Sequence, residues 1–158
     1  MNVNTTGTFL FSRAVARGMI ERGEGGSIVQ ISSIMGFSGG GLYPNISYQT
    51  SKGAVVNMTR ALAVEWAPLN IRVNCVAPGA IETEGWNVYT PEARAAYPRS
   101  NPMMRAGSPW DIAEASVYLA APSGKFVTGE TLTVDGGGQL WGETWTTGKP
   151  RYFGGESE

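Results

Sequence analysis

The chain of 158 residues contains no histidine and one cysteine, Cys75, and its 12 basic and 13 acidic side chains leave a net charge of −1. Without an imidazole, Ser-His-Asp and Cys-His relays and histidine-based zinc sites are excluded, and we expect no metal site. A single cysteine forms no internal disulfide, and the scattered basic residues give no stripe for nucleic acid. We therefore expect a cytoplasmic protein in which tyrosine, lysine, a carboxylate or water moves protons.

Two features argue against a membrane partner. The residues between Glu24 and Lys52 carry no charge, but serine, glycine, asparagine and proline interrupt the stretch, which favours buried core and loops over a membrane span. The first six residues lack the basic and apolar regions of a signal peptide. The length fits one domain.

The first half of the chain predicts two helices around a strand. Apolar residues recur at helical spacing over residues 5 to 22, where Gly23 ends the pattern, and again over residues 47 to 66. Between them, residues 27 to 33 form a short β-branched run bounded by glycines, which is typical of a buried strand.

The second half repeats the alternation. Residues 71 to 77 predict a second buried strand, and residues 131 to 134 a third. Residues 83 to 108 lack clean periodicity and predict a long loop or lid. Ser108 and the proline after it open a further helix, with Asp111 placed to complete a capping box.

Alternation of helices and strands with short connections predicts parallel strands and right-handed crossovers. The expected fold is therefore α/β, a Rossmann-like doubly wound parallel sheet. A six-stranded sheet of this class needs roughly 180 residues or more, so about three strands with flanking helices make an incomplete version.

The most informative spacing is Tyr48-Gln-Thr-Ser-Lys52, which puts a phenol and an ammonium on one face of a helix. A phenol titrates near pH ~10, but a cation a few ångströms away favours the phenolate, so this pair can exchange protons without histidine. The alternative is an exposed helical pair with no chemical role. Ser33 ends a strand at the sheet edge where open α/β folds bind ligands, which favours a shared site.

Further motifs occur in order over residues 1 to 138. They are Asn4-x-x-Gly7, Ile31-Ser-Ser33, Tyr48-x-x-x-Lys52, Ile71-Arg-Val-Asn74, Pro78-Gly79-x-Ile81-x-Thr83, Asp111-Ile-Ala113, Val127-Thr-Gly129 and Val134-Asp-Gly-Gly137. In this ordered set the chain resembles the short-chain dehydrogenase/reductase family, of the classical type. The resemblance implies a Rossmann fold, a nicotinamide cofactor (NAD or NADP) and hydride transfer between that cofactor and a carbonyl or alcohol carbon.

The resemblance also implies catalytic roles for four residues. Tyr48 would exchange a proton with the substrate oxygen, and Lys52 would favour its phenolate and bond the nicotinamide ribose, which Tyr48 also touches. Ser33 would hold the substrate oxygen, and Asn4 would help anchor the waters that resupply protons. From the residues alone, Asn4 is equally well a helix-start cap and Ser33 a hydroxyl bonded to backbone.

A second group would bind the cofactor. Pro78, Gly79, Ile81 and Thr83 would line the nicotinamide end, where the Ile81 backbone and the Thr83 hydroxyl meet the carboxamide. The family's opening motif, Gly-x-x-x-Gly-x-Gly, does not occur in this sequence. Residues 1–138 therefore resemble the C-terminal, catalytic part of a family member, without the adenine side that selects NAD or NADP. We expect the strand at residues 27 to 33 to have an unpaired edge, and cofactor binding by this chain alone to be weak or absent.

Aromatic and methionine side chains predict an apolar substrate, a small carbonyl or alcohol or an acyl thioester. Residues 139–158 form an aromatic tail.

Relatives pack their two long helices, here 5 to 22 and 47 to 66, into homodimers or homotetramers. The alternatives are an inactive remnant that acts only through such contacts, an enoyl-thioester reductase and, less favoured, a dehydratase or epimerase. The side chains that suggest the apolar pocket are Trp86, Tyr89, Tyr97, Met103 and Met104 in the lid, and Leu140, Trp141, Trp145, Tyr152 and Phe153 in the tail.

Overall fold

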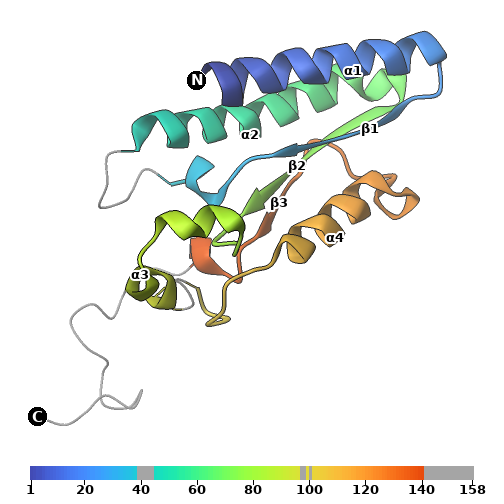
Figure 1. Cartoon of the computed structure of the whole chain (residues 1–158). Helices are drawn as coiled ribbons and strands as arrows, with labels where there is room; N and C mark the ends of the chain where they lie inside the picture. The colour runs from blue at the N-terminus through green and yellow to red at the C-terminus, as the bar shows by residue number, and fades with distance from the viewer. Residues whose placement is uncertain (39–44, 97–98, 100, 141–158) are drawn as a thin grey trace, which may run out of the picture.

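A computed structural model of the chain describes residues 1–38, 45–96, 99 and 101–140. Three parallel strands form one sheet in the order β1-β2-β3, with β1 at Gly26–Ile31, β2 at Ile71–Pro78 and β3 at Thr131–Val134. Two long helices, α1 (Thr8–Arg22) and α2 (Ile46–Trp66), cover one face of the sheet, and α4 (Pro109–Ala120) covers the other (Figure 1). This arrangement confirms the incomplete doubly wound sheet that the alternation of elements predicts.

The middle strand, β2, pairs in parallel with both other strands. Val29 of β1 lies beside Asn74 of β2, and Val76 of β2 lies beside Leu132 of β3. The side chains of β2 are almost all buried because helices cover both faces of the sheet. Among the described residues, β1 pairs on one side only, as the sequence predicts, so its other edge is open.

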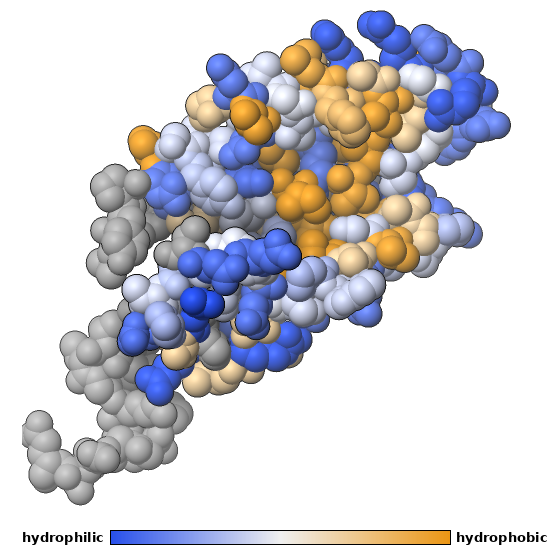
Figure 2. All heavy atoms as spheres, viewed as in Figure 1, coloured by the Kyte–Doolittle hydropathy of each residue, from blue (hydrophilic) through white to orange (hydrophobic). Residues whose placement is uncertain are grey.

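The open edge of β1 lies on an apolar side of the molecule. Figure 2 shows apolar surface gathered where β1 runs between α1 and α4. Exposed apolar side chains on these elements include Phe11 on α1, Ile31 on β1 and Val117 on α4. Burial of apolar surface is the main driving force of folding, and these side chains contribute little of it because they stay exposed.

The first helix begins earlier than the apolar spacing predicts. Asn2–Gly7 (η1) wind as a π-helix, and α1 continues from Thr8 to Arg22, ending at Gly23 with φ of 70°. No side chain caps the start of η1 or of α1. Asn4 lies inside this π-helical turn rather than capping it. Such wide turns are rare and occur frequently at functional sites.

The helix α2 (Ile46–Trp66) lies beside α1 over the core. The core cluster between these helices and the sheet contains Ala16, Leu62, Trp66, Ile28 and Val73. On the opposite face, α4 (Pro109–Ala120) begins with the predicted capping box, in which Ser108 and Asp111 bond each other's backbone.

A buried polar network crosses the same core. The Gln30 side-chain amide donates to Ser12 Oγ at 3.0 Å, and its carbonyl accepts from Thr59 Oγ1 at 2.8 Å. All three residues are at most 4% exposed. Because a buried polar group without a partner is costly, this network fixes how α1, β1 and α2 sit on one another.

The predicted lid contains structure of its own. Glu84–Val88 (η4) form a 3-10 helix and Pro91–Ala96 (α3) a short α-helix. Other one-turn 3-10 helices lie at Ile34–Gly36 (η2), Ala67–Leu69 (η3), Pro122–Gly124 (η6) and Gly138–Leu140 (η7). Apart from residues 139 and 140, the aromatic tail lies outside the described residues.

Candidate active site

A cleft of about 930 Å³ opens at the edge of the sheet where β1 and β2 end. Its walls come from the end of β1, the first turns of α2, the segment after β2 and the start of α4. Seven of the eight predicted site residues line it: Ser33, Tyr48, Lys52, Pro78, Gly79, Ile81 and Thr83. Helical spacing alone brings only Tyr48 and Lys52 together, and the parallel sheet brings the other five to the same place.

Lys52 is the cation among the described residues that line this cleft, which also include the acidic Asp135. Its Nζ donates a hydrogen bond to the Ile31 carbonyl oxygen at 3.1 Å and lies 5.6 Å from the centre of the Tyr48 ring. Burial lowers the pKa of Lys52, and the nearby Cys75 partly opposes this shift. The ammonium therefore lies close to the phenol, within the range of a cation–π contact, and shares its cleft.

Ser33 lies in the cleft and is also hydrogen-bonded to the backbone. It is 8% exposed and lines the cleft, and its Oγ also accepts a hydrogen bond from the Met35 N–H at 3.2 Å, which caps η2. The backbone bond fixes the hydroxyl oxygen and leaves its proton available for another acceptor.

Asn4 does not line the cleft. Its side-chain amide donates to Ser51 Oγ at 3.1 Å, and Ser51 in turn donates to the Tyr48 carbonyl oxygen at 2.7 Å. Asn4 therefore contacts the site through the α2 backbone.

Two serines that sequence reasoning misses hold the site together. Ser51 is completely buried, and Ser32 Oγ donates to the Lys52 carbonyl oxygen at 2.8 Å, which ties the end of β1 to α2. The available signal was their position, since each directly precedes a predicted site residue, Lys52 and Ser33 respectively.

The segment after β2 is held against the end of β3. The Gly79 N–H donates to the Val134 carbonyl oxygen at 3.0 Å, and a Cβ at Gly79 would lie 2.6 Å from Asp135 Cβ. Only glycine fits there without displacing the neighbouring chain. Ile81 then forms a single parallel bridge with Gly107.

The remaining wall is largely apolar. Met35, Trp86, Tyr89 and Ile112 line it, which agrees with the prediction for Trp86 and Tyr89. Met103 lines a smaller neighbouring pocket instead, and Met104 lines neither cavity. Leu140 is 88% exposed, and Tyr97 and the rest of the predicted tail residues lie outside the described residues.

Comparisons with known proteins agree with this geometry. A family model described as "Enoyl-(Acyl carrier protein) reductase" matches residues 1–139. Galactitol 2-dehydrogenase (L-tagatose-forming) of Cereibacter sphaeroides is 43% identical over 143 residues, which cover 89% of this chain and 56% of that protein. The 3-oxoacyl-[acyl-carrier-protein] reductase FabG of Aquifex aeolicus is 39% identical over 137 residues, covering 87% of this chain and 54% of the relative.

Solved structures match as well. A short-chain type dehydrogenase/reductase from Mycobacterium marinum aligns with a TM-score of 0.81 and 38% identity, over 87% of this chain and 54% of that one. A 4-hydroxyisoleucine dehydrogenase complexed with NADH and succinate aligns with a TM-score of 0.79 and 31% identity, over 89% and 57% respectively. The chain therefore belongs to the short-chain dehydrogenase/reductase family, whose members are NAD- or NADP-dependent oxidoreductases.

The chain spans about half the length of the curated relatives it matches. Within the described ranges, none of its helices has the length and apolar character needed to cross a bilayer.

Proposed function

We propose that residues 1–138 are the catalytic part of an oxidoreductase that transfers a hydride between a nicotinamide cofactor and a carbonyl or alcohol carbon. The observation that carries the proposal is the cleft itself. Ser33, Tyr48 and Lys52 share it with the Pro78-to-Thr83 segment, so proton transfer and nicotinamide binding fall in one cavity.

The cofactor, NAD or NADP, supplies the hydride when it is bound. The residues present fit its nicotinamide end, because the Lys52 ammonium donates one hydrogen bond to the Ile31 carbonyl oxygen and has two further N–H groups for ribose hydroxyls. Tyr48 lies beside it for the same ribose. Pro78 and Gly79 form the floor, and the Ile81 backbone and Thr83 hydroxyl are suited to the polar carboxamide.

Tyr48 is the general acid and base of the proposal. In reduction, the phenol O–H gives its proton to the carbonyl oxygen as the carbon receives the hydride, and the phenolate is stabilised by the adjacent Lys52 cation. In oxidation, the phenolate takes the proton from the alcohol. Ser33 donates to the substrate oxygen and holds it in place, while Asn4 supports α2 beneath Tyr48 and the water path behind Lys52.

The substrate of the proposal is a small apolar carbonyl or alcohol, or an acyl thioester. The support is the apolar wall of Met35, Trp86, Tyr89 and Ile112. The relatives are named for different substrates, a sugar alcohol in one case and an acyl-carrier-protein thioester in another. The proposal of an apolar substrate therefore rests on the side chains of this wall and not on the names of the relatives. An enoyl-thioester reductase remains the alternative within the family.

The partner of the proposal is a second copy of the chain, in a homodimer or homotetramer that packs α1 and α2. A groove of about 530 Å³ runs between these helices, lined by Phe9, Ile20 and Trp66 among others. Phe11 and Val64 on the same helices are 72% and 79% exposed.

A chain without turnover that only associates through these faces is the second candidate. A cytoplasmic location is part of the proposal because Cys75 is a buried free thiol.

Titration with reduced nicotinamide mononucleotide tests the proposal, since this probe carries only the end of the cofactor that the cleft would bind. We expect the amide resonances of Ile81 and Thr83 to shift on titration, and Lys52→Ala to abolish the shifts. Lys125→Ala, an exposed lysine in the loop after α4, is the matched control and should leave them unchanged. Because binding by this chain alone is expected to be weak, the titration is carried to a large excess of the probe, and absence of any shift there would contradict the proposal.

A further inference from the structure

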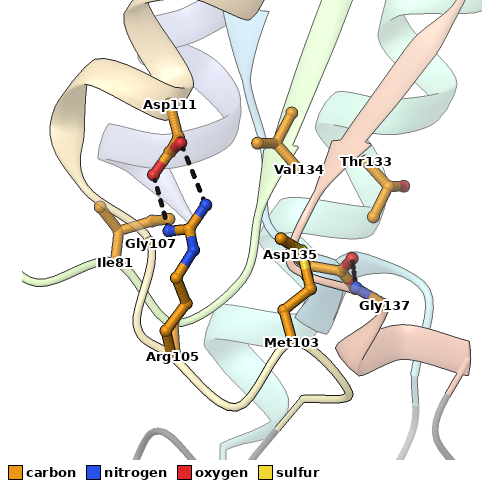
Figure 3. A pocket seen from close by; sticks show the side chains of 11 residues that line it. Ile81, Met103, Arg105, Gly107, Asp111, Thr133, Val134, Asp135 and Gly137 are labelled. Carbon is orange, nitrogen blue, oxygen red and sulfur yellow. Dashed lines mark hydrogen bonds and ion pairs between the residues drawn. The ribbon is translucent and has the colours of Figure 1, made fainter.

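A second pocket, of about 310 Å³, lies next to the cleft and shares Ala80, Ile81 and Asp135 with it. Figure 3 shows Arg105 extending across this pocket towards Asp111, with Ile81 and Gly107 beside the pair. The pocket therefore adjoins the segment that the proposed function assigns to the nicotinamide end.

The guanidinium of Arg105 contacts both oxygens of the Asp111 carboxylate. Nη1 lies 3.2 Å from Oδ2 and Nη2 lies 3.5 Å from Oδ1, the two-pronged arrangement that gives an arginine–carboxylate pair a defined geometry. Nη1 also donates to the Ala106 carbonyl oxygen at 3.0 Å. Asp111 is itself fixed, because its Oδ2 accepts from the Ser108 N–H at 2.7 Å.

Gly107 lies between Arg105 and Asp111 in the sequence, and its backbone pairs with the segment after β2. The Gly107 N–H donates to the Ala80 carbonyl oxygen at 2.9 Å, and the Glu82 N–H donates to the Gly107 carbonyl oxygen at 2.8 Å. A Cβ at Gly107 would lie 2.5 Å from Ile81 Cδ1, so the side chain of Ile81 packs directly on this glycine. The chain therefore enters the predicted lid just after this backbone bridge and comes back to the bridge at Gly107.

The backbone just before Gly107 is also held by a buried side chain. Asn101, which is 3% exposed, donates from its side-chain amide to the Arg105 carbonyl oxygen at 2.8 Å. Met104 has φ of 54°, a conformation that non-glycine residues adopt only when their surroundings impose it. The backbone at Arg105 is thus held in one course immediately before the bridge.

We propose that Arg105 and Asp111 are positioning residues that close the base of the lid. Their contact holds Gly107 against Ala80, Ile81 and Glu82, and so sets the Ile81 backbone for the nicotinamide carboxamide. The pair acts through Gly107 and does not itself touch the cofactor. The part of the inference that concerns the carboxamide rests on the proposed function.

Arg105→Gln tests this role because it removes the ion pair and leaves the Ser108–Asp111 capping box intact. Amide hydrogen exchange and binding of reduced nicotinamide mononucleotide are measured on the full 158-residue chain. We expect exchange at Glu82 and Gly107 to accelerate roughly tenfold or more, with binding weakened, while amides within α4 keep their protection. Arg105→Lys, which keeps the charge, should restore part of both. Arg60→Gln, an exposed arginine on α2, is the matched control.

Unchanged exchange at Glu82 and Gly107 in Arg105→Gln would overturn the inference, as would equal acceleration throughout α4, which would indicate general loosening. Weaker binding without faster exchange at the bridge would also overturn it. If the unmodified chain does not bind the mononucleotide, the proposed function fails, and exchange at the two bridge amides still decides whether the pair closes the lid.

Discussion

The side-chain amide of Asn4 donates a 3.1 Å hydrogen bond to Ser51 Oγ and so joins the π-helical turn before α1 to α2, 47 residues later in the chain. Ser51 passes the contact on by donating to the Tyr48 carbonyl oxygen. The turn of α2 that presents Tyr48 to the cleft is therefore held from behind by a residue of another helix.

Ser51→Ala should lower the free energy of unfolding by about 1–3 kcal/mol, because it leaves the Asn4 amide without this buried partner. Amide exchange should also quicken in residues 2–7. Urea denaturation and exchange measurements check this, with Ser123→Ala, an exposed serine after α4, as the control expected within about 0.5 kcal/mol of the unmodified chain. Equal effects of the two substitutions would show that the Asn4 contact contributes nothing.

Tyr48→Phe should reduce turnover by about 10²–10⁴-fold in any form of the protein that oxidises NADH or NADPH with a carbonyl substrate, because it removes the proton donor and keeps the ring. Loss of NADH or NADPH absorbance measures the rate. Tyr118→Phe on α4 is the control, and its rate should be unchanged. Retained turnover in Tyr48→Phe would assign the proton transfer to another group.

Thr59→Val should lower the free energy of unfolding by about 1–3 kcal/mol, since the Gln30 carbonyl oxygen loses its 2.8 Å donor in the core. The double variant Gln30→Leu/Thr59→Val removes both partners and should cost less than the sum of the single changes. Chemical denaturation of the three variants measures the coupling. Strict additivity would mean that the two side chains do not stabilise each other.

Protonation of Asp111 should weaken the capping box at low pH. Hydrogen bonds from the Ser108 N–H, followed by the Arg105 side chain, lower the pKa of Asp111 from its ordinary 3.8 to about 2. The ionised form therefore stabilises the fold above pH 3.8, and this contribution is lost as the pH falls towards 2. Asp111→Asn should be less stable at neutral pH and should lose less stability over that interval. Denaturation at stepped pH measures both, and Glu114→Gln reports the effect of removing another carboxylate from α4.

Phe11→Ser or Val64→Ser should shift the chain towards monomer, because these side chains are exposed on the faces proposed to meet a second copy. Sedimentation velocity over a range of concentrations measures the shift. Phe126→Ser removes a fully exposed aromatic outside α1 and α2, and should leave the association unchanged. Identical sedimentation of all four chains would remove α1 and α2 as the interface.

The sequence by itself determined the class of fold and the pairing of Tyr48 with Lys52 on one helical face. Local periodicity and capping are properties of neighbouring residues, so the strand at Thr131–Val134, the Ser108–Asp111 cap and the Tyr48–Lys52 face were all predictable. The tertiary structure alone decided what meets across the chain. Asn4 proved to be a partner of Ser51 rather than a helix cap, and Gly107 to be a partner of Ile81, because both contacts join segments whose approach depends on how helices and strands pack. Spacing along a helix fixes which residues share a face, whereas only the packed sheet brings the ends of separate strands to one cleft.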